Sequence, residues 1–190
     1  MGRLVISTNM TLDGVVLDPD GKQGFDGGGW FPRYGGADLA AWAEMGLAEA
    51  REAEALLLGR RTDEWFAARW PGREGEWADL LNAMPKYVVS ASLATAQWSN
   101  ATVLGADWRD HVGHIKQAAY GDVLVYASYE LGRALLEDGL VDEIRLTVFP
   151  VVLGAGDRLF GATPSSVPLR LISSRALGSG LAFLHYEVQR

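Results

Sequence analysis

A glycine, two arginines and a threonine follow an apolar run, and this turn is the strongest candidate for chemistry in the sequence. Residues 55–58 have no polar face, which predicts a short strand buried on both sides, and residues 63–69 are compatible with a helix. A strand that turns through Gly59 into a helix leaves free backbone N–H groups at the helix start, and these favour an anion. The guanidinium groups of Arg60 and Arg61 add bidentate donors suited to phosphate.

The same turn also fits a plain, solvated helix start. In that interpretation Arg60 and Arg61 form surface ion pairs with Asp63 and Glu64, and no ligand is bound. Short motifs match by chance often enough that the local residues leave both interpretations open.

Composition limits the classes of protein to consider. The chain has 190 residues, 48% of them hydrophobic and 22% charged, which predicts one soluble domain over residues 1–190. The net charge of -7 argues against nucleic acid or an anionic membrane as a partner. Cysteine is absent, which excludes disulfides and thiolate metal sites and fits a reducing compartment. With no signal-peptide pattern and no membrane-spanning run, we expect a cytoplasmic protein.

Strand and helix patterns alternate along most of the chain, and strands end it. The predicted strands are 3–10, 55–58, 86–90, 101–104, 122–126, 142–148, 167–173 and 181–188. The predicted helices are 38–51, 63–69, 74–83, 107–119 and 129–138, with one helical turn at 158–160. This order predicts an α/β fold in which helices cover a mainly parallel sheet. Residues 177–180 predict a hairpin that makes the C-terminal edge antiparallel.

Small or basic residues follow three of the predicted strands. Gly59, Ser90 and the pair Ala127–Ser128 each stand where a strand gives way to the next segment. Ligands of such sheets bind beyond the carboxyl ends of the strands. We therefore expect these turns to converge on one rim of the sheet.

Residues 24–36 form a long segment rich in glycine and aromatic side chains, which predicts a loop. Trp30 and Phe31 could form a lid or a stacking wall for a flat ligand. The alternative is that both rings close the loop onto the core, and the sequence leaves this open.

Five segments together resemble the dihydrofolate reductase-like superfamily. The resemblance is closer to stand-alone relatives of the reductase domain of the bifunctional deaminase-reductase of riboflavin biosynthesis. The segments are Ser-Thr-Asn-Met-Thr-Leu-Asp-Gly at 7–14, Leu-Leu-Gly-Arg-Arg-Thr at 57–62, Lys-Tyr-Val-Val-Ser at 86–90, Gly-Leu-Val-Asp-Glu-Ile-Arg-Leu at 139–146, and Pro-Val-Val-Leu-Gly-Ala-Gly-Asp-Arg-Leu-Phe at 150–160. The last two in combination are the most specific.

The resemblance implies a three-layer α/β/α fold that binds NADPH and reduces a pteridine- or pyrimidine-type heterocycle, as 5-amino-6-(5-phosphoribosylamino)uracil reductase does. Gly59, Arg60, Arg61 and Thr62 would hold the cofactor phosphates, with Arg60 at the 2′-phosphate, and Ser90 would lie at the adenosine end. It also implies cofactor contacts by Val16, Ala127, Ser128, Tyr129, Glu130 and Leu131.

The turn at residues 127–129 departs from the family pattern, which is usually rich in glycine there. A Cβ atom at Ala127 and a ring at Tyr129 crowd the approach of a phosphate to the backbone. A non-catalytic nucleotide-binding module on the same fold therefore stays open as an alternative.

On the substrate side, the resemblance implies contacts by Thr8 and Asn9 and by the loop that carries Trp30 and Phe31. Dihydrofolate reductases place an acid on their first helix, and Ala-Asp-Leu-Ala at 37–40 is similar to that segment, which makes Asp38 a candidate catalytic acid. Its alternative is a plain N-cap. Asp13 is a second candidate, with a turn residue as its alternative.

Two further features concern metals and partners. His111 and His114 are three residues apart on a predicted helix, but no nearby ligand completes a metal pattern, so no metal site is predicted. The apolar stretch 148–153 could cover a homodimer interface, since relatives of the family often pair, and an interaction protein is the third interpretation.

Overall fold

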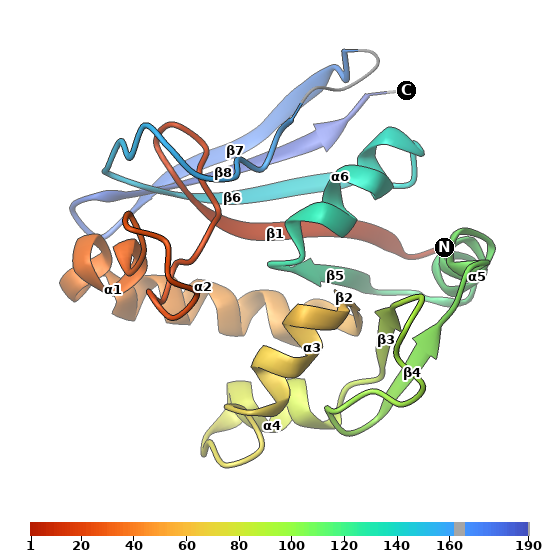
Figure 1. Cartoon of the computed structure of the whole chain (residues 1–190). Helices are drawn as coiled ribbons and strands as arrows, with labels where there is room; N and C mark the ends of the chain where they lie inside the picture. The colour runs from red at the N-terminus through yellow and green to blue at the C-terminus, as the bar shows by residue number, and fades with distance from the viewer. Residues whose placement is uncertain (162–165, 190) are drawn as a thin grey trace.

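The structure is a computed structural model that describes residues 1–161 and 166–189. Within these residues the chain forms one eight-stranded sheet with the order β4-β3-β2-β5-β1-β6-β8-β7 (Figure 1). The strands are β1 (Arg3–Thr11), β2 (Ala53–Gly59), β3 (Lys86–Val89), β4 (Ala101–Leu104), β5 (Asp122–Tyr126), β6 (Glu143–Phe149), β7 (Leu169–Leu177) and β8 (Leu181–Val188). The helices are α1 (Trp30–Gly35), the 3-10 helix η1 (Gly36–Asp38), α2 (Leu39–Glu52), α3 (Arg60–Ala67), α4 (Glu76–Ala83), α5 (Trp108–Ala118) and α6 (Tyr129–Glu137).

The sheet is mixed, as the sequence predicts. The first six strands in this order, from β4 at one edge to β6, are all parallel. Strand β8 is antiparallel to both of its neighbours, β6 and β7. The turn between Leu177 and Leu181 closes the predicted hairpin. Among the described residues, no helix has the length and apolar character needed to cross a membrane.

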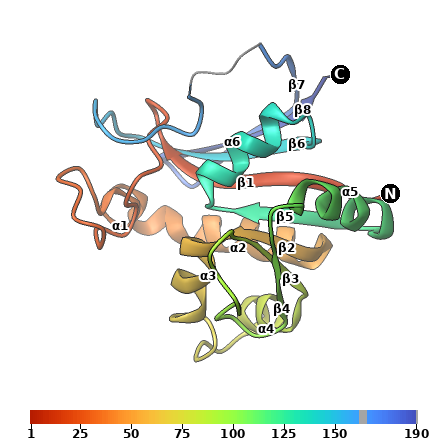
Figure 2. The same ribbon diagram turned by 45° about the vertical axis from the view of Figure 1, so that its right-hand side comes forward.

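Each central strand packs into two cores because successive side chains point to opposite faces. Leu4 and Ile6 of β1 pack with α5 and α6, whereas Val5 between them packs with α2, α3 and α4. Strand β2 repeats the pattern with Leu57 on the first face and Leu58 on the second. Figure 2 shows α5 and α6 apart from α2 and α4, across the sheet. A third cluster joins α1 and α2 to the ends of β6 and β8.

Two predicted elements differ from the structure. The predicted loop 24–36 contains α1, which begins at Trp30. The predicted helical turn at 158–160 is wrong: Arg158 forms an isolated bridge with Val15, and its side chain donates to the carbonyl of Asp13 at 3.0 Å. These long-range contacts fix Arg158 against Val15, where local propensity alone favours a helical turn.

The apolar stretch 148–153 is divided between the core and the surface. Val148 is 8% exposed and Phe149 is fully buried in the cores, while Val152 is 65% exposed. Val148 and Phe149 therefore pack inside the protein, whereas Pro150 and Val152 are exposed to solvent.

Asp63 anchors the start of α3 to the segment that follows β3. Its side chain is fully buried and accepts the backbone N–H groups of Gln97 at 2.8 Å and Trp98 at 3.2 Å. The Trp98 ring stacks on Phe66 of α3, and Lys86 Nζ lies 4.4 Å from the centre of the Trp98 ring. Burial lowers the pKa of Lys86 to about 8. The first turn of α3 is therefore held in place from its buried side.

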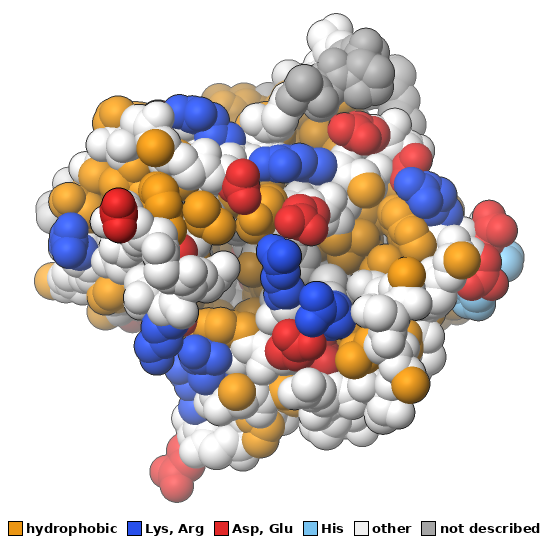
Figure 3. Space-filling view, viewed as in Figure 1, with side chains coloured by type: hydrophobic (Ala, Val, Ile, Leu, Met, Phe, Trp, Pro, Cys, Tyr) orange, Lys and Arg blue, Asp and Glu red, His pale blue; other side chains and the backbone are white. Residues whose placement is uncertain are grey.

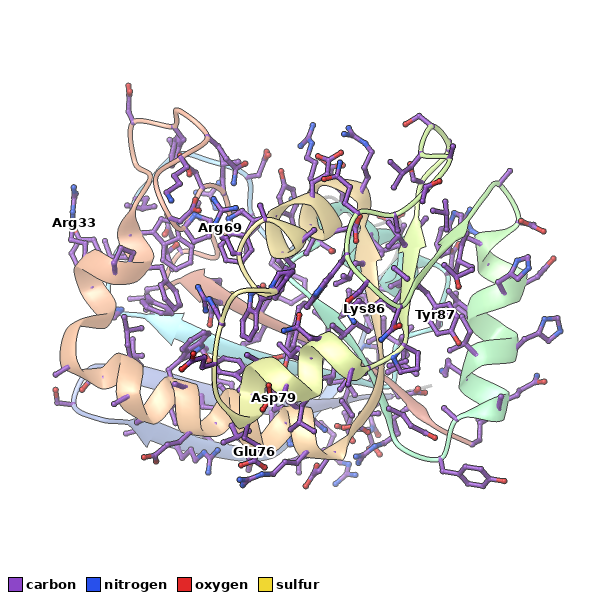
Figure 4. All side chains as sticks on the ribbon, turned by 90° about the horizontal axis from the view of Figure 1, so that it is seen from below. Arg33, Arg69, Glu76, Asp79, Lys86 and Tyr87 are labelled. Carbon is purple, nitrogen blue, oxygen red and sulfur yellow. The ribbon has the colours of Figure 1, made fainter. Side chains whose placement is uncertain are left out.

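We expect Asp63→Ala to lower the free energy of unfolding by about 3 kcal/mol, because the buried N–H group of Trp98 and the partly buried N–H group of Gln97 lose their acceptor. Urea denaturation measures the change. Asp79→Ala is the control, since Asp79 lies with Glu76 on the exposed side of α4 (Figure 4) and its loss should change stability by less than about 0.5 kcal/mol. Equal losses in the two variants would contradict the anchoring role.

Candidate active site

Two helices begin side by side at the carboxyl ends of β2 and β5. Helix α3 starts after Gly59, and α6 starts after Ser128. The Gly59 N–H donates to Ser128 Oγ at 3.0 Å, and Ser128 Oγ donates to Thr62 Oγ1 at 2.9 Å. Helix starts carry free N–H groups and partial positive charge, so this junction is suited to an anion. Two of the three predicted turns therefore meet in space.

Ser90, the third predicted turn residue, lies one strand further along the same edge. Strand β3 is parallel to β2, with Val89 opposite Gly59. The Ser90 hydroxyl accepts the N–H groups of Ser92 at 3.3 Å and Leu93 at 3.0 Å. It therefore stabilises its own turn, and a contact with the adenosine end of a cofactor stays a prediction.

Both arginines of the turn are exposed and ion-paired. Arg60 pairs with Glu64 at 2.9 Å within α3, and Arg61 pairs with Glu130 of α6 at 3.6 Å. Asp63, expected as a possible partner, is buried instead. Figure 3 shows basic and acidic side chains next to one another across the middle of this face. Exposed pairs contribute about 0–1 kcal/mol, so a phosphate can displace either carboxylate.

The backbone of the 127–128 turn has the conformation for which glycine is preferred. Ala127 has a φ of 49° and Ser128 a φ of 41°, both left-handed. The residues differ from the glycine-rich family pattern, yet they adopt a backbone that side chains disfavour. Ser128 is the N-cap residue of α6 by position, but its hydroxyl makes no cap and bonds across the rim instead.

The other predicted cofactor residues surround this junction. The Tyr129 hydroxyl donates to Asp157 Oδ2 at 2.8 Å, and burial together with Asp157 raises the pKa of Tyr129 to about 12. The Val16 N–H donates to the Asp157 carbonyl at 2.8 Å, and both Val16 and Leu131 are buried in the core beside α6. Asp157 thus joins the start of α6 to the loop after β1.

Asp13 joins two loops at the end of β1. Its carboxylate accepts from the Thr11 hydroxyl at 2.6 Å and from the N–H groups of Leu153 at 3.2 Å and Gly154 at 2.9 Å. Burial raises the pKa of Asp13, but these hydrogen bonds together hold it below its usual value. The Asp13 carboxylate is therefore ionised, and its oxygens already accept three hydrogen bonds. This suits a structural acceptor better than a proton donor.

Asp38 bonds to the turn between β7 and β8. Its oxygens accept the N–H groups of Ser179 at 3.0 Å and Gly180 at 2.7 Å, and these bonds lower the pKa of Asp38. The N-cap alternative is wrong in its chemistry, because the side chain makes no capping bond to α2. A catalytic role for Asp38 stays a prediction that requires its release from this turn.

The predicted substrate residues differ in how far they are buried and in which contacts they make. Trp30 is 1% exposed and donates to the Leu17 carbonyl at 2.9 Å, so its indole closes the loop onto the core and forms no open wall. Phe31 is half-buried, 4.9 Å from the Trp42 ring. Asn9 Oδ1 accepts from Trp42 Nε1 at 2.8 Å. Thr8 is buried on the opposite face of β1 from Asn9.

A polar cluster beneath α2 was not predicted. Ser7 of β1 donates to Glu49 Oε2 at 2.8 Å, and Arg145 lies 3.5 Å from Glu49 Oε1. Tyr126, opposite Ser7 in the sheet, has a buried hydroxyl with no hydrogen-bond partner among the described residues. The available signal was an acid on the apolar face of the 38–51 helix, seven residues after Trp42.

The two arginines of this cluster have closer partners than Glu49. Arg3 and Arg145 each contact both Asp122 and Glu143 at 2.7–2.9 Å. Because Arg145 is nearer to those two carboxylates than to Glu49, burial outweighs its attraction and raises the pKa of Glu49. Glu49 is thus held towards its neutral form. No group of three or more potential ligands for a metal ion occurs in the described part of the chain.

The sequence is similar to known proteins along almost its whole length. A family model described as the RibD C-terminal domain matches residues 3–183. The uncharacterized protein YyaP of Bacillus subtilis (strain 168) is 26% identical over 195 residues, which cover 97% of this chain and 94% of YyaP. The uncharacterized protein YwjB of the same organism is 24% identical over 186 residues, which cover 97% of each chain.

Solved structures share the fold at low identity. A putative riboflavin biosynthesis protein from Shewanella sp. PV-4 has a TM-score of 0.76 at 20% identity, with both chains fully covered. RibD of Acinetobacter baumannii has a TM-score of 0.67 at 17% identity and matches all of this chain over 58% of its own length. Dihydrofolate reductase from Enterococcus faecalis, complexed with NADP(H) and RAB-propyl, has a TM-score of 0.63 at 16% identity, covering 99% and 97% of the two chains.

Glu49→Gln should become more stable relative to the unmodified protein as the pH rises above 4.5. The folded state keeps the Glu49 proton after the unfolded chain has lost it, so ionisation opposes folding in that range. Glutamine removes this penalty and still accepts from Ser7. Urea denaturation at pH 4.5 and pH 8 should show the difference between the two proteins grow with pH in favour of Glu49→Gln.

Glu76→Gln provides the control with the opposite sign. Its side-chain hydrogen bond from Arg51 lowers the pKa of this exposed Glu76, so the stability that its ionisation contributes is gained as the pH rises towards 4.5. Glu76→Gln should therefore lose stability relative to the unmodified protein over that lower range and change little between pH 4.5 and pH 8. A stability difference for Glu49→Gln that stays flat or shrinks with pH would show that Glu49 is ionised in the fold.

Proposed function

We propose, because the chain belongs to the RibD C-terminal domain family, that it is an NADPH-dependent reductase of a small heterocyclic molecule. The family is one of NADPH-dependent reductases, and the fold is that of dihydrofolate reductase. The observation that carries the proposal is the junction of α3 and α6, where Gly59, Ser128 and Thr62 are hydrogen-bonded beside two arginines. We place the phosphates of the cofactor there.

The donors at the junction fit a dinucleotide phosphate. All of the groups there are hydrogen-bond donors in their ordinary protonation states. They are the first N–H groups of α3, the Thr62 hydroxyl and the guanidinium groups of Arg60 and Arg61. When bound, NADPH supplies the hydride. The chain itself orients the cofactor at the ends of β2 and β5.

The substrate lies, in this proposal, between α2 and the ends of β1 and β5. Asn9 and Trp42 present a polar edge there, and Phe31 packs against Trp42. The first fifty residues contain three basic side chains, Arg3, Lys22 and Arg33, and Arg3 lies at the other end of β1, paired with Asp122 and Glu143. We therefore favour a heterocycle without a phosphate over the ribityl phosphate of riboflavin biosynthesis.

The acids differ in their suitability as the source of a proton. Asp13 and Asp38 have pKa values below their usual range and accept backbone N–H groups. Glu49 has a raised pKa, but its oxygens lie beneath α2 and out of contact with solvent. A direct donor role for Asp38 therefore requires opening of the β7–β8 turn.

A non-catalytic nucleotide-binding module is the second candidate. Two features of the rim favour it, because both hinder the approach of a cofactor. Arg61 pairs with Glu130, and residues 127 and 128 carry side chains where the family pattern has glycine. Such a module would bind NADPH without reducing any heterocycle. Incubation with NADPH and a panel of pteridines, folates and ribosylaminopyrimidines, followed at the nicotinamide absorbance, separates the two functions.

Arg60→Ala should weaken NADPH about 10- to 100-fold and change NADH by less than twofold. The expected loss is that of one charged hydrogen bond to the 2′-phosphate, about 1.5–3 kcal/mol. Titration followed by nicotinamide fluorescence gives both dissociation constants. Arg51→Ala is the control, because Arg51 is similarly exposed and ion-paired but bonds to Glu76 on α4.

Two outcomes would contradict this assignment. Equal losses for NADPH and NADH would remove Arg60 from the 2′-phosphate. Failure of the unmodified protein to bind either nucleotide would reject the cofactor itself.

A homodimer is also part of the proposal. Exposed apolar side chains at Val152 and, along the edge strand β7, at Leu169, Leu171 and Ile172 are available to a second copy. We expect sedimentation velocity to show a dimer at micromolar concentration. A single monomer boundary there would reject it.

A further inference from the structure

The hydroxyl of Ser128 occupies the centre of the candidate phosphate site. It is half-buried and bridges the two strand ends, accepting from Gly59 N–H at 3.0 Å and donating to Thr62 Oγ1 at 2.9 Å. A serine hydroxyl has a single proton, so donation to Thr62 uses it completely. Ser128 therefore has no donor left for a ligand.

The consequence falls on Thr62. Its oxygen accepts from Ser128, so its own proton is free to turn outward from the first turn of α3. A phosphate can only accept, and a bound phosphate would take that proton. The donor-to-acceptor direction of this series of hydrogen bonds is then fixed. It runs from Gly59 N–H through Ser128 to Thr62 and on to the phosphate. Each bond in such a chain polarises the next and strengthens it.

We propose that Ser128 is a positioning residue for the cofactor phosphate, and that it acts by orienting the Thr62 hydroxyl as a donor. The inference rests on the proposed function, and it specifies how the site works without the glycine-rich turn of the family. A crowded turn loses close approach of the backbone, and the Ser128–Thr62 pair supplies a fixed side-chain donor in its place.

The backbone supports a requirement for the serine side chain. Ser128 has a φ of 41° and Ala127 a φ of 49°, values at which glycine is less strained than either residue. The two positions differ in what their side chains do. Ala127 is exposed and has only a methyl group, whereas the Ser128 hydroxyl makes two hydrogen bonds to α3 and its preceding residue.

Substitution of Ser128 by glycine and by alanine distinguishes the effect of the hydroxyl from the effect of the Cβ atom. If crowding by side chains limits cofactor binding, Ser128→Gly should tighten NADPH. If the hydroxyl relay acts as proposed, Ser128→Gly should weaken NADPH 5- to 20-fold, and Ser128→Ala, which keeps the Cβ atom, should weaken it equally. Ala127→Gly is the matched control, because it relieves the neighbouring left-handed residue without touching the relay, and it should leave the affinity within twofold or improve it.

Thr62→Val provides the second half of the test. Valine keeps the shape of threonine and removes its donor, so it should weaken NADPH to a similar degree. The double variant Ser128→Ala/Thr62→Val should bind no more weakly than Thr62→Val alone, because Ser128 acts through Thr62. A merely structural serine would give additive losses and a matching fall in the melting temperature.

The outcomes distinguish this inference from the proposed function. If the unmodified protein binds NADPH and the Ser128 variants bind it as well or better, the relay is rejected and the reductase proposal stands. Additive losses in the double variant also reject the relay. If the unmodified protein does not bind NADPH, both proposals fail together.

Discussion

The parallel register of β2 against β5 is the constraint on which the candidate site depends. Leu56 lies opposite Leu124 in the middle of the sheet, so the two strands leave it at the same level, at Gly59 and at Ala127. Both strands are buried on both faces, and neither can slip without moving apolar side chains out of a core. The helices that follow must therefore start next to each other. Their N-terminal ends define the rim before any side chain contributes to it.

A second constraint is the burial of charge beneath α2. Buried Arg145 and half-exposed Arg3 pair with the carboxylates of Asp122 and Glu143, and His185 contacts Glu143 as well. Burial raises the pKa of Glu49, because its desolvation outweighs the attraction of Arg145 at 3.5 Å. This arrangement holds α2 against the sheet with a polar contact to Ser7. The contact of α2 with the sheet thus includes a buried acid that local sequence patterns do not single out.

The sequence predicted the sheet better than the side-chain contacts. Strands such as 122–126 are apolar runs with no competing pattern, and burial makes them unambiguous. Residues 158–160 favour a helical turn locally, but the bridge to Val15 is a long-range contact that no local pattern contains. Asp38 stands at an N-cap position, yet the N–H groups of the β7–β8 turn, some 140 residues away in sequence, take its oxygens.

The same distinction applies to the candidate site. Gly59 and Ala127–Ser128 could be placed on one rim from sequence, because strand ends of a parallel sheet share an edge. The bond from Gly59 to Ser128 could not, because the expected role of Ser128 was to cap its own helix. Trp30 is similar: its composition fits a ligand wall or a core plug, and only the contact with Leu17 decides between them.

The two halves of the proposed site therefore follow from different physics. The phosphate rim follows from sheet register, which chains with the same strands share even at low identity. The substrate side follows from particular contacts, such as Asp38 with the β7–β8 turn and Asn9 with Trp42. A single substitution can change such a contact while the sheet keeps its register. Chains of this fold can then keep one cofactor and diverge in substrate, so the substrate has to be sought in the residues around α2 rather than at the arginine turn.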